Sequence, residues 1–164
     1  MALPVEPLEP VRRSVVVPVP PERAFVLFAG DIGRWWPLEQ HSLGRERALD
    51  VTIEPRTGGL VVECIDSGAE AQWGSVLAWE PPARLVLAWH PGRGGDEPFT
   101  EVEVTFAAAA GGATLVQLAH HGWERLAVPQ QARSNYLNGW PTVLDRFGEH
   151  AGAGTSASRE EAAA

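Results

Sequence analysis

The sequence predicts one α+β domain in which an antiparallel sheet is covered by a single long helix. Three observations support this fold class. Apolar residues recur every three or four positions within residues 129–150, as on one face of an amphipathic helix, at Ala132, Tyr136, Trp140, Leu144 and Phe147. Every stretch with a strand pattern precedes that helix. The connections between these stretches have the length of hairpins, and hairpins join antiparallel strands.

The predicted elements follow one another along residues 11–150. Three consecutive valines indicate a first strand within residues 11–19, and the prolines at 18 and 20 end it. Pro21 starts a short helix, and a second short helix covers residues 33–36. After a polar loop over residues 38–48, six further strands are expected around residues 51–53 and in residues 60–65, 72–80, 84–90, 100–106 and 114–121.

The long helix contains one unfavourable stretch, Gly139-Trp140-Pro141. An interior glycine costs about 1 kcal/mol and an interior proline about 3 kcal/mol relative to alanine. We expect the helix to bend or break there, because Pro141 cannot donate a hydrogen bond to the carbonyl of Leu137. Local rules tend to be broken at functional or tightly packed places, so this stretch marks a region of interest.

Composition excludes several function classes. The net charge of −8 argues against a nucleic-acid surface. All 13 basic residues are arginine, so neither a Schiff-base lysine nor a phosphate-loop lysine is present. The single cysteine, Cys64, allows no intramolecular disulfide and is expected in the core.

No signal peptide and no membrane span are expected, which predicts a cytoplasmic protein. The lysine-free composition indicates a GC-rich bacterial genome.

The chain divides into three predicted parts. Residues 1–10 form a proline-rich, flexible lead, and residues 11–150 form the single domain. Residues 151–164 are small, polar and low in complexity, so a disordered tail is expected there.

Six sequence stretches, in their order and spacing, carry a resemblance to a known family: GRWWP, IEPRTGG, EAQWGSVLAWEPPARLVLAWH, TEVEVTF, LAHHGW and NGWPTVLDRF. Together they resemble the SRPBCC superfamily, specifically bacterial relatives of the activator of heat-shock-protein ATPase (AHSA-like), over about residues 11–149. The resemblance implies a START-like, helix-grip fold. In that fold a curved seven-stranded antiparallel sheet wraps around the long C-terminal helix, two short helices follow the first strand, and a cavity lies between sheet and helix.

Strand alternation and helix periodicity indicate which side chains would line such a cavity. Inward-facing positions of the strands and one row of the long helix are expected to contribute, together with several of the seven tryptophans. The predicted lining residues are Trp36, Val61, Glu63, Trp73, Trp89, Val102, Val104, Phe106, Val116, Leu118, His120, Tyr136, Trp140 and Leu144. A large apolar pocket with a few polar groups is the usual form of a small-molecule site.

Glu63 and His120 stand out as polar residues on apolar strand faces. A buried acid and an imidazole could act as a general acid-base pair. The alternative is structural: His120 as a hydrogen-bonded core residue, and Glu63 as the partner of an arginine. The five histidines show no metal-binding spacing, so neither a metal nor another cofactor is expected.

Three functions of different classes follow. The first is binding of a hydrophobic or aromatic small molecule, lipid-like or polyketide-like, in the cavity. The second is an enzyme of the cyclase or hydrolase type that uses Glu63 and His120, as some superfamily members imply. The third is a chaperone-associated protein-interaction module. Binding ranks first, because aromatic content and the resemblance both favour it. A monomer or a homodimer is expected.

Overall fold

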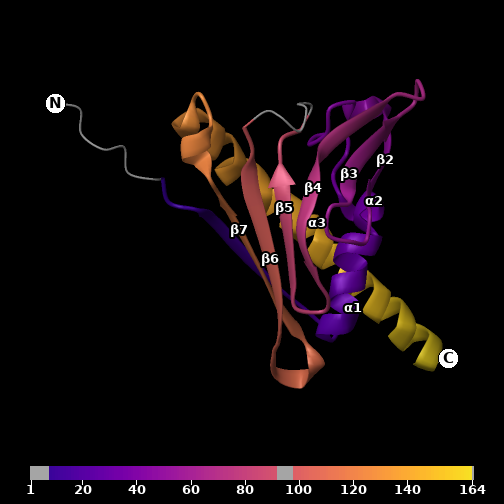
Figure 1. Ribbon diagram of the computed structural model, residues 1–164. Coiled ribbons are helices and arrows are strands. Elements are labelled where there is room, and N and C mark those ends of the chain that lie inside the picture. The colour runs from indigo at the N-terminus through magenta and orange to yellow at the C-terminus, as the bar shows by residue number, and fades with distance from the viewer. Residues whose placement is uncertain (1–7, 92–97, 164) are drawn as a thin grey trace.

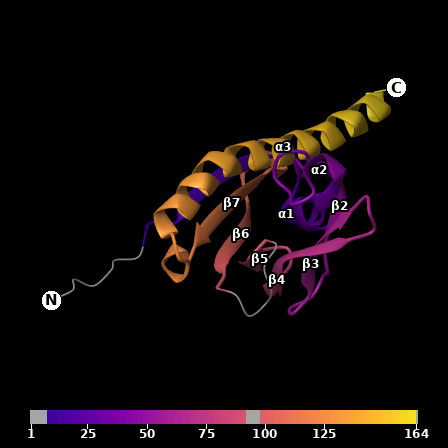
Figure 2. The same cartoon turned by 90° about the horizontal axis from the view of Figure 1, so that it is seen from above.

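Seven antiparallel strands form one sheet, and a long helix lies across one of its faces (Figures 1 and 2). The computed structural model describes residues 8–91 and 98–163, with side chains up to residue 152. The strand order is β1-β7-β6-β5-β4-β3-β2. The strands are β1 (Val11–Val17), β2 (Ala48–Ile53), β3 (Leu60–Ile65), β4 (Glu70–Glu80), β5 (Arg84–Trp89), β6 (Thr100–Ala108) and β7 (Thr114–His121). The α+β, helix-grip fold class is therefore confirmed.

Two short helices connect the opposite edges of the sheet. Helix α1 (Pro21–Phe25) begins with proline at its first turn, where a missing N–H costs nothing, and continues into one turn of π-helix (Val26–Gly30). Helix α2 (Ile32–Trp35) follows directly. The chain must cross the open side of the sheet here, because β1 and β2 are its two edge strands. These helices fill that side with Phe25, Phe28 and Trp35.

Strands β6 and β7 show the expected alternation of side chains. Val102, Val104 and Phe106 are buried on β6, and they pair with His120, Leu118 and Val116 of β7. Glycines 111 and 112 make the tight turn between the two strands, both with positive φ (73° and 78°), a conformation that costs glycine little. The inward face predicted for both strands is therefore the buried one.

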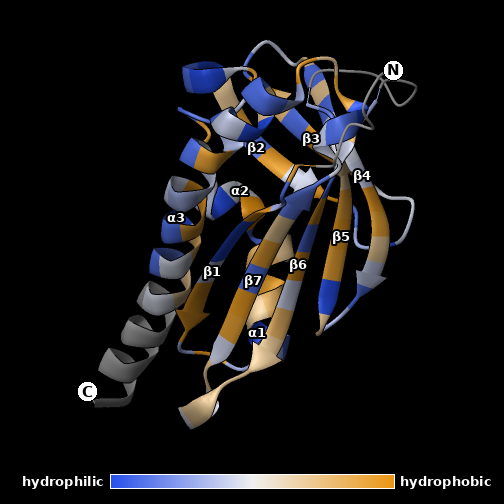
Figure 3. Ribbon diagram, turned by 90° about the vertical axis from the view of Figure 1, so that its left-hand side faces the viewer, coloured by the Kyte–Doolittle hydropathy of each residue, from blue (hydrophilic) through white to orange (hydrophobic). Residues whose placement is uncertain are grey.

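Helix α3 (Pro129–Ala163) presents its apolar side to the sheet (Figure 3). Trp140, Val143, Leu144 and Phe147 are buried along this side. The helix is continuous through Gly139–Pro141, so it does not break there, and the alternative of a bend stays a prediction. It also runs past the expected end at His150, since buried Ala151 continues the packed row. The division of the chain into lead, domain and disordered tail stays a prediction.

The interior between sheet and helices has a solid half. Five aromatic side chains pack there with ring centroids 5.0 to 5.7 Å apart, drawn from α1, the π-helical turn, α2, β6 and α3: Phe25, Phe28, Trp35, Phe106 and Phe147. Such tilted and edge-to-face pairs add to the stabilisation that burial gives.

No helix within the described ranges has both the length and the hydropathy to cross a bilayer.

Candidate functional site

A cavity of about 250 Å³ occupies the other half of the interior, between α3 and strands β4 and β5. Its walls come from α3, from Trp73 within β4, from Trp89 at the end of β5, and from the segment that follows α2. The lining residues are Trp36, His41, Ser42, Leu43, Trp73, Trp89, Pro91, Asn135, Tyr136, Gly139, Trp140 and Val143. Leu43 is 46% exposed and Asn135 is exposed as well, so the cavity opens to solvent beside these two residues.

Four buried tryptophans form the inner wall of the cavity. We call Trp36, Trp73, Trp89 and Trp140 the tryptophan cluster; neighbouring rings have centroids 5.1 to 6.0 Å apart. Tyr136 stacks on Trp140 at 6.1 Å and extends the aromatic surface along α3. Trp36 follows α2, Trp73 and Trp89 lie on β4 and β5, and Trp140 lies on α3. The cluster therefore forms only when the chain is folded.

Every indole N–H of the tryptophan cluster donates a hydrogen bond to the protein. The acceptors are the His41 carbonyl for Trp36 (2.7 Å), Glu63 Oε1 for Trp73 (2.7 Å), the Tyr136 hydroxyl for Trp89 (2.9 Å) and His120 Nδ1 for Trp140 (3.0 Å). Buried Trp N–H groups usually find such partners. The hydrogen bonds fix the ring orientations, and the apolar ring faces remain to line the cavity.

Glu63 fixes the loop at the mouth of the cavity by hydrogen bonds to its backbone. Its side chain is fully buried, and besides Trp73 it accepts hydrogen bonds from the backbone N–H groups of Leu43 (2.9 Å) and Gly44 (2.7 Å). Residues 41–44, which we call the rim loop, are thereby tied to β3. Charge-assisted hydrogen bonds of this kind are stronger than neutral ones. Glu63 therefore positions the rim loop, and it does not line the cavity.

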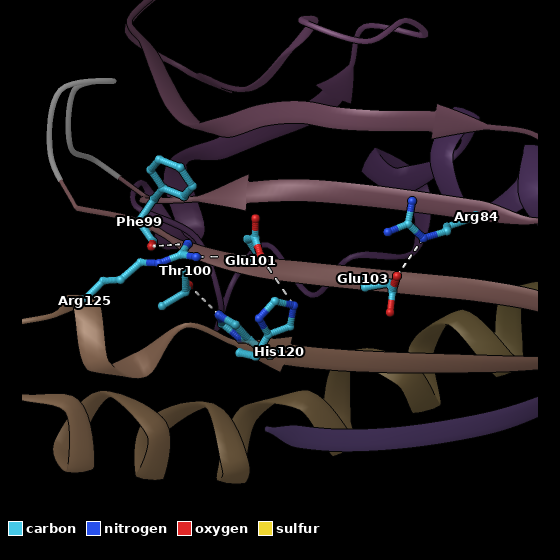
Figure 4. A network of polar contacts seen from close by, with 8 residues as sticks. Arg84, Phe99, Thr100, Glu101, Glu103, His120 and Arg125 are labelled. Carbon is cyan, nitrogen blue, oxygen red and sulfur yellow. Dashed lines mark hydrogen bonds and ion pairs between the residues drawn. The ribbon is translucent and has the colours of Figure 1, made fainter. Parts of the chain in front are cut away.

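His120 supports the tryptophan cluster in the same way. Its Nδ1 accepts the Trp140 hydrogen bond, and its Nε2 lies 2.6 Å from Thr100 Oγ1 (Figure 4). The neutral ring thus carries its proton on Nε2, where it donates to Thr100. Burial, and to a smaller extent the neighbouring His121, lowers the pKa of His120 to about 3. A neutral imidazole therefore orients Trp140.

The opposite face of the same strands carries a separate ionic network (Figure 4). Glu101 Oε2 lies 3.5 Å from His121 Nε2 and 4.0 Å from an Arg125 guanidinium nitrogen, and Arg125 also donates to the Phe99 carbonyl (3.4 Å). These side chains are part exposed, so each pair contributes at most about 1 kcal/mol. The network faces away from His120, because neighbouring residues of a strand point to opposite faces.

The structure brings together part of the predicted cavity lining. Trp36, Trp73, Trp89, Tyr136 and Trp140 line the cavity. The other predicted lining residues are buried elsewhere in the interior, at Val61, Glu63, Val102, Val104, Phe106, Val116, Leu118, His120 and Leu144. No hydrogen bond among the described residues joins Glu63 to His120, and each is engaged by other groups.

Sequence reasoning missed the rim of the cavity. The rim loop, Pro91, Asn135 and Gly139 have no apolar periodicity, so pattern alone does not place them. One signal was available at Gly139, where a costly glycine interrupts a helical row. An added Cβ there would lie 3.4 Å from His41 Cε1, an ordinary van der Waals contact, so Gly139 lies beside that imidazole.

Comparison with known proteins agrees with this architecture. A family model described as "Activator of Hsp90 ATPase homolog 1-like protein" matches residues 18–152. No curated protein sequence matches the chain.

Solved structures share the fold over nearly the whole chain. One is the anthrahydroquino-gamma-pyrone synthase Txn09, complexed with SUM, at 28% identity and a TM-score of 0.57, covering 88% of this chain and 97% of that one. A second is the self-sacrificing resistance protein CalC from Micromonospora echinospora, with 24% identity, a TM-score of 0.61, and coverage of 87% and 94%. A third is the HSP90 activator PFC0360w from Plasmodium falciparum, with 18% identity, a TM-score of 0.52, and coverage of 78% and 87%. On the match over residues 18–152 and the helix-grip architecture, the chain belongs to the activator of Hsp90 ATPase homolog 1-like family, within the SRPBCC superfamily.

Proposed function

We propose that the protein binds a hydrophobic, aromatic small molecule in the cavity between α3 and the sheet. The observation that carries the proposal is the tryptophan cluster: four buried indoles whose N–H groups are all engaged and whose ring faces surround about 250 Å³. A side chain that served only as core would be expected to pack without leaving such a space. Pre-oriented aromatic walls favour flat ring systems, which stack in offset or edge-to-face geometry.

The size of the cavity limits the part of a ligand that it encloses. An apolar cavity of about 150 Å³ accommodates benzene. The 250 Å³ here therefore suit about two fused rings, and a larger ligand would extend past Leu43 and Asn135 into solvent. The similarity to the synthase Txn09, at 28% identity, supports a polycyclic aromatic ligand over a lipid chain.

A blocked cavity mouth tests the proposal. Asn135→Trp places a large side chain at the exposed rim, whereas Asn138→Trp makes the same change on α3 three residues away, outside the lining. Titration calorimetry with a hydroxyanthraquinone and with palmitate should show binding of the aromatic compound by wild type and by Asn138→Trp. Asn135→Trp should weaken that binding at least about tenfold, since exclusion from a pocket removes most of the apolar burial. Equal affinities in both variants, or no aromatic binding by wild type, would refute the proposal.

An enzyme that acts on such a ligand is the second candidate, favoured by the similarity to a synthase. In this case Glu63 and His120 act as positioning residues, because neither lines the cavity. Glu63 would hold the rim loop and His120 would hold Trp140. The interaction with a chaperone stays a prediction from the family name, and so does the cytoplasmic location.

A further inference from the structure

One polar side chain in the cavity wall, that of His41, supports neither the tryptophan cluster nor the backbone of the rim loop. His41 lies in the rim loop, and its imidazole contributes to the lining. No carboxylate and no guanidinium lines the cavity in the described part of the chain, and His41 supplies its only imidazole. A ligand with a polar substituent would therefore meet this ring first on the mouth side of the tryptophan cluster.

The backbone of His41 is fixed on both sides. Its N–H donates to the Pro37 carbonyl (2.9 Å), and its carbonyl accepts from Trp36 Nε1 (2.7 Å). Two and three residues further on, the N–H groups of Leu43 and Gly44 donate hydrogen bonds to Glu63. The ring itself rests against the bare backbone of Gly139, where an added Cβ would lie 3.4 Å from Cε1 and 3.8 Å from Nδ1. These backbone contacts place the imidazole beside Gly139 at the cavity wall.

The ring nitrogens of His41 make no hydrogen bond within residues 8–91 and 98–163. The other polar side chains of the rim are engaged. Ser42 Oγ donates to the Leu38 carbonyl and accepts from the Arg45 N–H, and Asn135 accepts from Gln131. The Tyr136 hydroxyl accepts from Trp89. Among the described lining residues with a polar side chain, His41 is therefore the one whose side chain makes no hydrogen bond to the rest of the described chain.

We propose that His41 is a specificity-determining residue that hydrogen-bonds a ring hydroxyl of the ligand, so that the site selects hydroxylated aromatics over hydrocarbons and acyl chains. This inference rests on the proposed function and specifies its ligand class. A neutral imidazole has one donor and one acceptor nitrogen, and a phenolic hydroxyl can satisfy either of them. The ring system of the ligand packs against the apolar tryptophan cluster, and its hydroxyl group hydrogen-bonds His41 at the rim.

The experiment compares two probes that differ by one hydroxyl group, naphthalene and 2-naphthol, by titration calorimetry. Wild type should bind 2-naphthol more tightly, and the ratio of the two dissociation constants should change by about fivefold to tenfold in His41→Phe, the size of one net hydrogen bond. His41→Gln keeps a donor and an acceptor and should restore most of the preference. His121→Phe, the same change on the outer face of β7, should leave the ratio at its wild-type value.

The ratio separates recognition from stability, because a variant that only loosens the fold weakens both probes together. If His41→Phe kept the wild-type ratio, the role of His41 would be refuted while binding in the cavity stood. If naphthalene bound and 2-naphthol did not, the ligand class would be wrong. If neither probe bound to wild type, the proposed function and this inference would fall together.

Discussion

Two buried polar residues, Glu63 and His120, shape the cavity without lining it. Each lies on the inward face of a strand, and each accepts an indole N–H of the tryptophan cluster. A buried polar group costs free energy unless its hydrogen bonds are made, so these contacts also specify a single arrangement of the rings. A substitution at either residue should therefore affect ligand binding indirectly, by changing the position of the tryptophans that line the cavity.

Glu63→Gln should destabilise the protein by about 1 to 3 kcal/mol, the cost of leaving a buried donor unsatisfied. Glutamine offers one oxygen, but three N–H groups converge on the two carboxylate oxygens of Glu63. Depending on which way the amide points, the Gly44 N–H, or both the Leu43 N–H and the Trp73 indole N–H, would face an NH₂ group. Urea denaturation measures the loss. The control is Glu54→Gln, which also alters an acceptor of a backbone N–H, but on a side chain that is 45% exposed. Equal losses in both variants would contradict the argument.

Acid should destabilise the fold through His120. Its folded pKa is about 3, below the ordinary histidine value of 6.5, so the unfolded chain binds the proton more readily between these values. This contribution to stability is complete above pH 6.5 and is lost as the pH falls toward 3, at about 1.4 kcal/mol per pH unit.

Carboxylates titrate in the same range, so the test is a difference between two proteins. The free energy of unfolding of wild type and of His120→Gln, measured by urea denaturation between pH 7 and pH 4, should fall more steeply for wild type. Parallel curves would show that His120 binds its proton equally well in the folded and unfolded states.

Residue patterns predicted where these side chains face, but not what they touch. Alternation placed Glu63 and His120 inward, because the period of a strand is two. Their partners come from the rim loop, from Thr100 at the start of β6, and from α3, and no local pattern connects such distant segments. The patterns did not predict that His41 lines the cavity either, because it lies in a polar loop without periodicity.

At the scale of the element, α3 shows how packing overrides local preference. Gly139 and Pro141 together cost about 4 kcal/mol in helix propensity. Burial of one large apolar side chain contributes about 1.5 to 3 kcal/mol, and Trp140, Val143, Leu144 and Phe147 are all buried on this helix. The helix does not break at Gly139–Pro141, because the packed face outweighs the local cost.

Gly139→Ala should separate stability from binding. Alanine is favoured over glycine inside a helix by about 0.5 to 1 kcal/mol, and an added Cβ would make only an ordinary contact with His41, at 3.4 Å. The added methyl group points at the cavity wall, so aromatic ligands should bind more weakly although the protein unfolds at higher urea concentration.

The control for this substitution is Gly152→Ala on the same helix. No atom lies within 4 Å of a Cβ built there, so this variant should gain similar stability and keep wild-type affinity. A Gly139→Ala variant that bound aromatic compounds as tightly as Gly152→Ala would show that the glycine has no part in the cavity.

At the scale of the whole molecule, one interior is divided into a solid half and a hollow half. The sequence predicted the sheet, the covering helix and the abundance of aromatic side chains, since these depend on periodicity and composition. It did not predict which aromatics pack solidly. Trp35 and Trp36 are neighbours in the chain, but Trp35 packs on Phe28 and Phe147, whereas Trp36 faces the cavity. That division depends on tertiary contacts across α2, the sheet and α3.

Trp140→Ala and Phe147→Ala test this division on one face of α3. Phe147 is fully buried among Phe28 and Trp35, so its truncation should cost about 3 to 5 kcal/mol, and folded molecules should keep wild-type affinity for aromatic ligands. Trp140 borders the cavity on one side, so part of its ring surface faces open space instead of packed side chains. Its truncation should cost less than that of Phe147, yet change affinity or selectivity clearly.

Urea denaturation gives the free energy of unfolding of each variant, and ligand titration under native conditions gives its affinity. Trp140→Phe refines the comparison, because it keeps an aromatic wall but removes the N–H donated to His120 Nδ1. If the wall matters more than that hydrogen bond, Trp140→Phe should retain most of the binding that Trp140→Ala loses. Severe destabilisation by Trp140→Ala with unchanged affinity per folded molecule would place Trp140 in the solid half, because a side chain that lines a ligand site cannot be removed without altering the surface that the ligand meets.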